Sequence, residues 1–240
     1  MKTATYLAFI AAAAFALLML ALKLNIIPAM KTTPDALDGR EVLILDAGHG
    51  GEDGGAVASD GTEEASLNLA VAQKTELIAS FFGVDVIMTR RSAEIDYPET
   101  ALTVKTRKTA DQKARLALIN RYPNAVLISI HQNKYTGSGP RGAQAFFAGT
   151  DGSRELAEMI QQLFCRLPTL ASDRVAMKAD NGIYLMKNAE CTAVLAECGF
   201  ISNPEELELL KSNTHQTNIA AALSAAYLST RFDSGVRING

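Results

Sequence analysis

Three side chains that could bind a metal ion or transfer a proton lie at the ends of short apolar runs typical of buried strands. His49 follows the first such run, His131 ends a second, and Glu197 ends a third. In open α/β sheets, ligands bind outside the carboxyl ends of the strands. A single polar residue at a strand end is usually only a cap, but three on one edge indicate a convergent site. We therefore expect these side chains to lie together.

The residues around His49 are rich in glycine, which lets the backbone turn sharply and leaves the imidazole uncrowded. The segment 46–55 reads DAGHGGEDGG. A phosphate-binding loop would continue with Gly-Lys-Ser or Gly-Lys-Thr into a helix, and no such sequence follows. Asp46 could orient His49 through its other ring nitrogen. Asp46 could equally hydrogen-bond the backbone of its own turn, and the sequence leaves both alternatives open.

Two adjacent glutamates, Glu63 and Glu64, open the helix expected after this loop. Acidic side chains in a first helical turn interact favourably with the helix macrodipole. That role suits one of the two, and the pattern does not decide which one turns inward. Ser129 shares a strand face with His131, and we expect it to pack in the core. We expect His215, at the start of the last helix, to be a solvated surface residue.

Short β-branched runs alternate with helical patterns from Glu41 onward, which predicts an α/β fold. We expect one domain over residues 41–232, with a mostly parallel twisted sheet of about six strands and helices on both faces. The predicted strands are Val42–Asp46, Asp85–Thr89, Ala125–His131, Ala143–Phe147, Gly182–Met186 and Ala193–Glu197. The predicted helices are Glu64–Phe82, Lys105–Arg121, Ser153–Leu167, Pro204–Lys211 and Gln216–Phe232. Between them, residues 91–104 and 168–181 are long loops of the kind that often form functional rims.

The N-terminal residues differ in composition from this domain. Residues 3–22 are uncharged and almost entirely apolar, a run long enough to cross a bilayer as a helix. No convincing signal-peptidase site follows, so residues 1–23 are expected to be an uncleaved membrane anchor, with a cleaved signal as the alternative. Residues 24–40 are expected to be a linker and 233–240 a C-terminal tail. The domain would then lie outside the cytoplasm, held at the cell membrane or secreted.

Charge and cysteine content exclude some functions and leave others open. The net charge is −3, and no run of Lys or Arg indicates nucleic-acid binding. The cysteines form no CxxC pair, and small buried hydrophobes are the favoured interpretation, although one disulfide remains possible. These cysteines are Cys165, Cys191 and Cys198.

Four sequence blocks with distinctive residues follow one another along the chain. The blocks are DAGHGG at residues 46–51, EASLNL at 64–69, SIHQN at 129–133 and ECGFISNPE at 197–205. In this order they resemble the signature blocks of the zinc-dependent N-acetylmuramoyl-L-alanine amidases of the type-3 family. The resemblance covers about residues 41–231, and four ordered blocks make it specific.

The resemblance implies a catalytic amidase domain that acts on peptidoglycan. By position, the zinc ligands would be His49, Glu64 and His131, and Glu197 would be the catalytic acid and base. Two His and one Glu form a known catalytic zinc set with a fourth position left for water. The bond cut would join N-acetylmuramic acid to the L-Ala of the stem peptide.

Two residues depart from the family pattern without replacing a ligand. Ala47 stands where the family usually has Pro, and Gln132 where a small or apolar residue is common. The arrangement of one anchored catalytic domain is similar to amidases that prepare the spore cortex for germination. Dependence on a protein activator stays open. Two other functions remain alternatives: a non-catalytic peptidoglycan-binding module, and a zinc carboxypeptidase that shortens the stem peptide.

Overall fold

The structure is a computed structural model that describes residues 41–136, 139–167 and 173–233. The predicted anchor and linker lie outside the described residues, as does the predicted tail beyond its first residue. No helix within the described ranges is long and apolar enough to cross a membrane.

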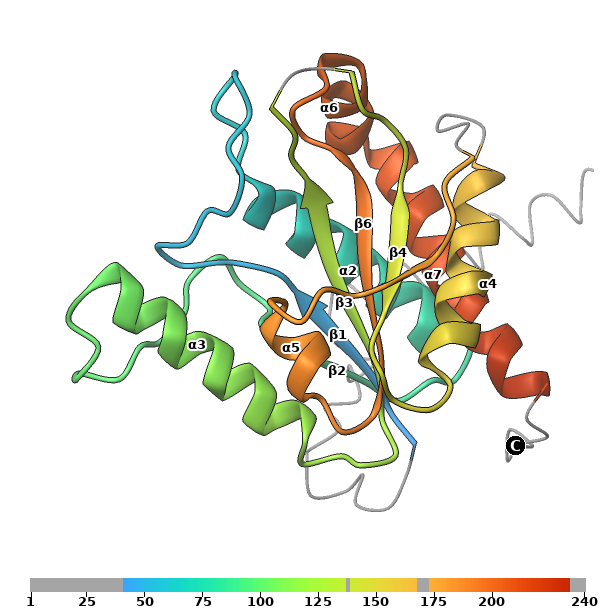
Figure 1. Cartoon of the computed structure of the whole chain (residues 1–240), viewed down its shortest axis with the longest axis horizontal. Coiled ribbons are helices and arrows are strands. Elements are labelled where there is room, and N and C mark those ends of the chain that lie inside the picture. Colours follow the sequence, from blue (N-terminus) through green and yellow to red (C-terminus); the bar gives the residue numbers. More distant parts are fainter. Residues whose placement is uncertain (1–40, 137–138, 168–172, 234–240) are drawn as a thin grey trace, which may run out of the picture. The chain divides into compact units, whose positions relative to one another are not determined.

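A mixed sheet of six strands forms the centre of the domain (Figure 1). Its order is β2-β1-β3-β6-β4-β5, and every pair is parallel except β4 with β6. This confirms the predicted fold class. The strands are β1 (Leu43–Ala47), β2 (Val86–Met88), β3 (Val126–Asn133), β4 (Gln144–Phe147), β5 (Met177–Lys178) and β6 (Thr192–Phe200).

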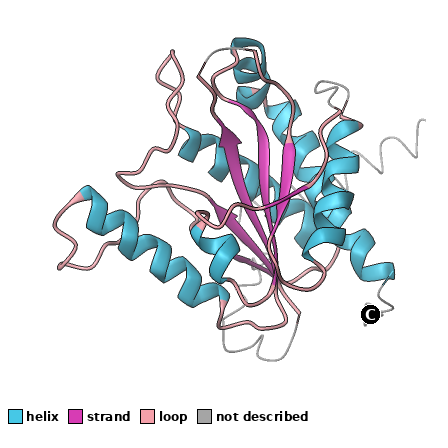
Figure 2. Ribbon diagram, in the orientation of Figure 1, coloured by secondary structure: helices cyan, strands magenta, loops and turns pink. Residues whose placement is uncertain are grey.

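The central strands are apolar because helices cover both of their faces. Every residue of β1 is buried, and most of β3 and β6 is buried as well. Helices α2 (Glu64–Phe81), α4 (Ser153–Cys165) and α7 (Asn213–Asp233) pack together on one face. Helices α3 (Val104–Ile119) and α5 (Tyr184–Asn188) lie on the other face, as Figure 2 shows.

One predicted strand is wrong. The segment predicted as Gly182–Met186 contains a turn and the start of the short helix α5, and the sixth strand is β5 instead. The side chain of Asp180 accepts a hydrogen bond from the Gly182 amide, and the Ile183 amide bonds to the Asp180 carbonyl, so the chain turns there. A short apolar run fits a buried helix as well as a strand, and these residues form the helix.

The carboxyl ends of β1, β3 and β6 meet at one edge of the sheet, uppermost in Figure 1. Helix α2 begins at the same edge, since the Glu64 amide bonds to Ala56 in the loop that follows β1. Helix α6 (Pro204–Lys211) follows β6 there and is capped by the side chain of Asn203. The domain therefore brings the ends of several elements to one place.

Candidate metal and catalytic site

Three of the predicted residues form a compact cluster at the carboxyl edge. His49 comes from the loop after β1, Glu64 from the first turn of α2, and His131 from β3. One ligand atom from each of them can be chosen so that all three lie within 4.8 Å of one another. The two imidazole centroids are 4.9 Å apart, with the rings nearly perpendicular at 76°.

The cluster fits a zinc ion in both chemistry and spacing. Zinc in proteins takes nitrogen and oxygen ligands at about 2.0–2.1 Å, so two ligand atoms of a tetrahedral site lie roughly 3.3 Å apart. His49 Nε2 lies 3.4 Å from Glu64 Oε1, and His131 Nδ1 lies 2.9 Å from the same oxygen. Two donor–donor distances are thus close to that separation, and one ligand atom of each residue can be chosen so that all three lie within 4.8 Å of one another.

Of the two glutamates, Glu64 turns inward and Glu63 stays exposed. One carboxylate oxygen of Glu64 accepts a hydrogen bond from the Ala56 amide, and the other accepts one from the Gln132 amide. Burial opposes ionisation, but the hydrogen bonds from His131 and His49 outweigh it and hold the pKa of Glu64 well below its usual range. Glu64 is therefore an anion, as a metal ligand must be.

The backbone around His49 depends on its glycines. His49 has a φ of 60°, a backbone conformation that residues other than glycine rarely adopt, and the next two residues also have positive φ. A Cβ atom at Gly48 would lie 2.2 Å from His131 Nε2, so any larger residue would displace the second histidine. A Cβ at Gly55 would lie 2.7 Å from the His49 ring. These contacts require glycine for a close approach of backbone to imidazole.

The residue that orients His49 is Asp53, and the prediction of Asp46 for this role is wrong. His49 Nδ1 lies 2.9 Å from Asp53 Oδ2 and is hydrogen-bonded to it. Burial lowers the pKa of His49, but the carboxylates of Glu64 and Asp53 outweigh it and raise the pKa above its ordinary value. Because His49 turns back in the left-handed conformation, its ring faces the residue four positions later in the chain.

Asp46 instead belongs to a buried polar network beneath the loop. Its carboxylate accepts hydrogen bonds from Thr89, Ser129 and Arg115, at 2.6–2.8 Å. Burial opposes ionisation of Asp46, but Arg115 and Ser129 overcome it and lower its pKa to about 2. Ser129 is buried as predicted, and it also donates one of these hydrogen bonds.

Two buried arginines hold the loop, and sequence reasoning missed both. Arg115 donates to the carbonyls of Ala47 and His49, and Arg90 donates to those of Ala47 and Gly48. Both side chains are almost fully buried. Nothing in the local pattern shows that these arginines bind the loop, because the Ala47, Gly48 and His49 carbonyls lie far from both of them in the sequence.

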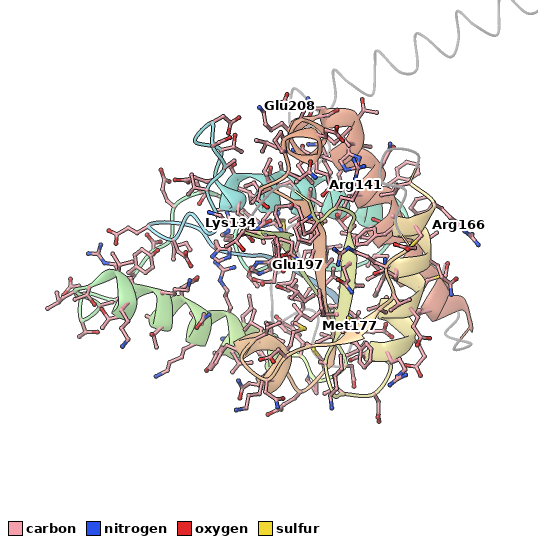
Figure 3. The ribbon with its side chains drawn as sticks, turned by 45° about the horizontal axis from the view of Figure 1, so that its top comes forward. Lys134, Arg141, Arg166, Met177, Glu197 and Glu208 are labelled. Atoms are coloured by element: carbon pink, nitrogen blue, oxygen red, sulfur yellow. The ribbon has the colours of Figure 1, made fainter. Side chains whose placement is uncertain are left out.

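Glu197 lies beside the cluster on β6. Its Cα is the register partner of His131 in the parallel β3–β6 pair. Its Oε2 atom is buried and has no hydrogen-bond partner among the described residues. Burial raises the pKa of Glu197, as does the charge of Glu64, and the two histidines lower it, with a net rise to about 7. Glu197 is central among the strand ends in Figure 3, with Lys134 and Arg141 nearer the rim.

The turn after Glu197 is fixed from helix α6. Glu206, which is 1% exposed, accepts hydrogen bonds at 2.6 Å from the amides of Phe200 and Gly142. This buried carboxylate joins the end of β6 to the segment that leads into β4. Glu206 falls inside an acidic helix start, where sequence reasoning has no means of separating it from its exposed neighbours.

The structure also tests the predictions for His215 and for the cysteines, which lie outside the cluster. His215 is buried at 2% exposure, so its assignment to the surface is wrong. It lies in the first turns of α7, where burial lowers its pKa. The three cysteines are free, and two of them are buried, which agrees with the preferred interpretation of these residues.

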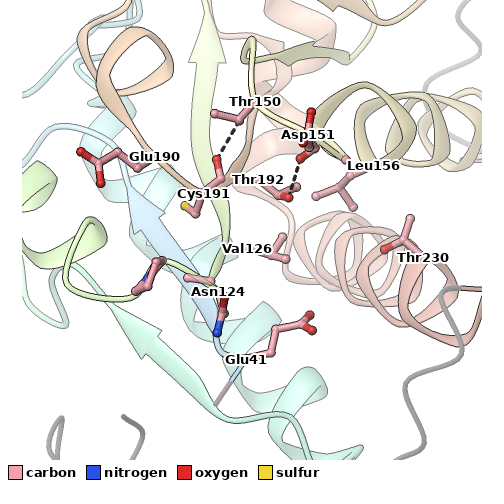
Figure 4. A pocket seen from close by; sticks show the side chains of 13 residues that line it. Glu41, Asn124, Val126, Thr150, Asp151, Leu156, Glu190, Cys191, Thr192 and Thr230 are labelled. Atoms are coloured by element: carbon pink, nitrogen blue, oxygen red, sulfur yellow. Dashed lines mark hydrogen bonds between the residues drawn. The ribbon is translucent and has the colours of Figure 1, made fainter. Parts of the chain in front are cut away.

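A cavity of about 770 Å³ opens at the opposite, amino edge of the sheet (Figure 4). It lies at the starts of β3 and β6, where Thr150 donates to the Cys191 carbonyl and Thr192 to the Asp151 carbonyl. Its lining contains no histidine. The reactive groups therefore lie at the other edge, and size alone does not make this cavity the active site.

The fold and the cluster together define an α/β domain with a site able to hold a metal ion beside a carboxyl group whose pKa burial raises, an arrangement suited to metal-dependent hydrolysis. A family model described as N-acetylmuramoyl-L-alanine amidase matches residues 43–228. The chain belongs to this family of amide hydrolases.

Individual proteins that are similar to this chain in sequence or structure are also amidases. The germination-specific N-acetylmuramoyl-L-alanine amidase of Bacillus subtilis (strain 168) is 36% identical over 184 residues, which cover 76% of each chain. The CwlD amidase from Clostridioides difficile, solved in complex with the GerS lipoprotein, superposes with a TM-score of 0.75 at 34% identity. That match covers 80% of this chain and 98% of the other. An N-acetylmuramoyl-L-alanine amidase from Clostridium difficile 630 gives a TM-score of 0.70 at 26% identity, over 82% and 98% of the two chains.

Proposed function

We propose that this chain uses zinc, held by His49, Glu64 and His131, to hydrolyse the amide bond between N-acetylmuramic acid and L-Ala in peptidoglycan. The observation that carries the proposal is the cluster itself, whose ligand atoms lie within 4.8 Å of one another beside a buried Glu197 oxygen that has no hydrogen-bond partner among the described residues. Zinc bound there would polarise the scissile carbonyl and make water acidic enough to attack at neutral pH.

Glu197 supplies the proton transfers. A carboxylate accepts a proton from the attacking water and, once protonated, returns that proton to the departing L-Ala nitrogen. Both halves of the cycle need a group whose two protonation states are close in free energy at working pH. Burial raises the pKa of Glu197 to about 7, above that of an ordinary glutamate, and a bound zinc ion would lower it from there. Burial thus offsets the effect of the metal and favours the return of the proton.

The experiment is digestion of purified peptidoglycan by the protein, with mass spectrometry of the products and metal analysis of the same sample. Free stem peptides that begin with L-Ala, together with about one zinc per chain, are the expected result. Shortened stems still joined to glycan would identify a carboxypeptidase. Retention on peptidoglycan without any product would identify a binding module.

We also propose that the protein acts on the spore cortex and works with a protein partner. The first part is supported by the germination-specific relative in Bacillus subtilis, and the second by the relative solved in complex with the GerS lipoprotein. Spores that lack the gene should form but fail to complete germination. Normal germination without the gene would remove the cortex role and leave the amidase activity untouched.

A further inference from the structure

Asn68 is a fully buried amide on α2, one helical turn after Glu64. Residues four apart on a helix share a face, so its side chain lies beside the Glu64 carboxylate. Asn68 Nδ2 donates to Glu64 Oε1 at 3.2 Å and to the carbonyl of Gly48 at 3.1 Å. Asn68 Oδ1 accepts a hydrogen bond from Gln132 Nε2 at 3.1 Å. Each of these partners belongs to a different element.

One of these three partners is a candidate zinc ligand, and the other two are sequence neighbours of the two remaining candidate ligands. Glu64 is itself a ligand, Gly48 precedes His49, and Gln132 follows His131. A carboxamide has two N–H donors and one carbonyl acceptor, and here each type of group has partners in the cluster. One side chain thus connects the loop after β1, the start of α2 and the end of β3.

The network also fixes which way round the amide lies. Two acceptors, the Gly48 carbonyl and the Glu64 carboxylate, face the same end of the Asn68 side chain, so that end must be the nitrogen. The opposite end then carries the oxygen, which the Gln132 amide donates to. An aliphatic residue at position 132 would leave that oxygen buried without this donor. The departure of Gln132 from the family pattern therefore has a structural role in this chain.

We infer that Asn68 is a positioning residue, which holds the three ligand-bearing segments in register before the ion binds, and that Gln132 locks its orientation. This inference rests on the zinc site proposed above. Hydrogen-bond partners of metal ligands typically change metal affinity by about 10–100-fold when they are removed. Because Asn68 has contacts with all three segments, we expect its replacement to weaken zinc affinity by a factor within that range.

The test compares zinc affinity in three variants of the full chain, measured by competition with a chromophoric chelator. Asn68→Leu keeps the approximate size of the side chain and removes all three hydrogen bonds. Gln132→Leu removes the bond to Asn68 Oδ1 but keeps its own backbone bond to Glu64. Thr75→Val is the matched control, because Thr75 is fully buried on α2 and its hydroxyl donates to the Val71 carbonyl within the same helix, away from the cluster.

The zinc dissociation constant should rise about 10–100-fold in Asn68→Leu and by a smaller factor in Gln132→Leu. It should stay within about twofold of the parent value in Thr75→Val, even where thermal unfolding of the metal-free protein shows similar destabilisation. Unchanged affinity in Asn68→Leu, or an equal rise in Thr75→Val, would overturn the inference. If Asn68→Leu does not fold, Gln132→Leu decides by the same comparison. A parent protein that binds no zinc would instead overturn the proposed function.

Discussion

His131 and Glu197 are direct register partners across β3 and β6, and the pairing of these two strands shifts immediately beyond them. Neighbouring strands lie about 4.8 Å apart, and paired residues point to the same face of a sheet. Backbone hydrogen bonds between the strands therefore fix the separation of the Cα atoms of a candidate zinc ligand and of the residue that would move the proton.

Replacement of His131 by alanine should abolish stoichiometric zinc binding. It removes one of the three protein ligands and leaves a carboxylate and one imidazole, a much weaker set. Metal analysis after dialysis should find close to one zinc per chain in the parent and little in the variant. His215→Gln is the control, since His215 lies outside the cluster and its loss should leave the zinc content unchanged. Full zinc occupancy in His131→Ala would remove His131 from the ligand set.

Replacement of Glu197 by glutamine should stop turnover and spare the metal. Glutamine keeps the shape of the side chain but cannot accept and return a proton, and general acid–base catalysis is typically worth about 10²–10⁴-fold. The turnover number should fall by that factor while the zinc content stays near one per chain. Glu52→Gln, an exposed position in the loop that carries His49, should change activity only slightly. The opposite pattern in these two variants would identify Glu52 as the base.

Asp46 should make the stability of the fold sensitive to acid. Its pKa is about 2 in the folded protein against an ordinary value of 3.8. A lowered pKa means that the stabilisation is fully present above pH 4 and is lost as the pH falls toward 2, by about 2 kcal/mol. Urea unfolding of the parent and of Asp46→Asn should show a gap in the free energy of unfolding that narrows over this interval.

At pH 5 the same Asp46→Asn variant removes one of the two carboxylates on the buried Arg115 guanidinium and leaves its ion pair with Asp111. Loss of one partner of a buried pair typically costs about 3–5 kcal/mol, and the remaining Asp111 should keep this loss at or below the lower end of that range. A gap near zero at pH 5 would mean that Asp46 does not hold Arg115 in solution.

Residues 1–23 should anchor the protein and leave its domain outside the cytoplasm. The reason is the uncharged apolar run at residues 3–22. Membrane fractions should retain the full-length chain after a high-salt wash, because salt screens charges but does not reverse hydrophobic insertion. Protease added to wall-stripped cells should then digest the domain. A mature N-terminus near Lys23 or Lys31, with the protein free in the medium, would show that the segment is a cleaved signal.

The sequence predicted the part of the site in which each strand end contributes a single reactive residue. His49, His131 and Glu197 each follow an apolar run, and the sheet brings these runs to one edge. The sequence did not predict the partner of His49, because Asp46 and Asp53 flank the same loop. Only the left-handed turn at His49 decides between them.

The remaining differences have similar physical causes. The apolar run at Gly182–Met186 fits two kinds of element, and the turn at Asp180 selects the helix. Arg90 and Arg115 act on backbone carbonyls that only the folded chain brings near. Asn68 lies within the EASLNL block, but its role depends on three elements that only the folded chain brings together.

The first described residue of the domain, Glu41, lines the cavity at the amino edge, while the reactive groups open at the opposite edge. Residue 41 thus lies at the edge of the sheet opposite His131 and Glu197. Beads or a surface that carry the domain by this end should leave the reactive edge accessible to a polymer as large and stiff as a glycan strand. Attachment through Lys134 or Arg141, which lie nearer to Glu197 in Figure 3, should reduce that access.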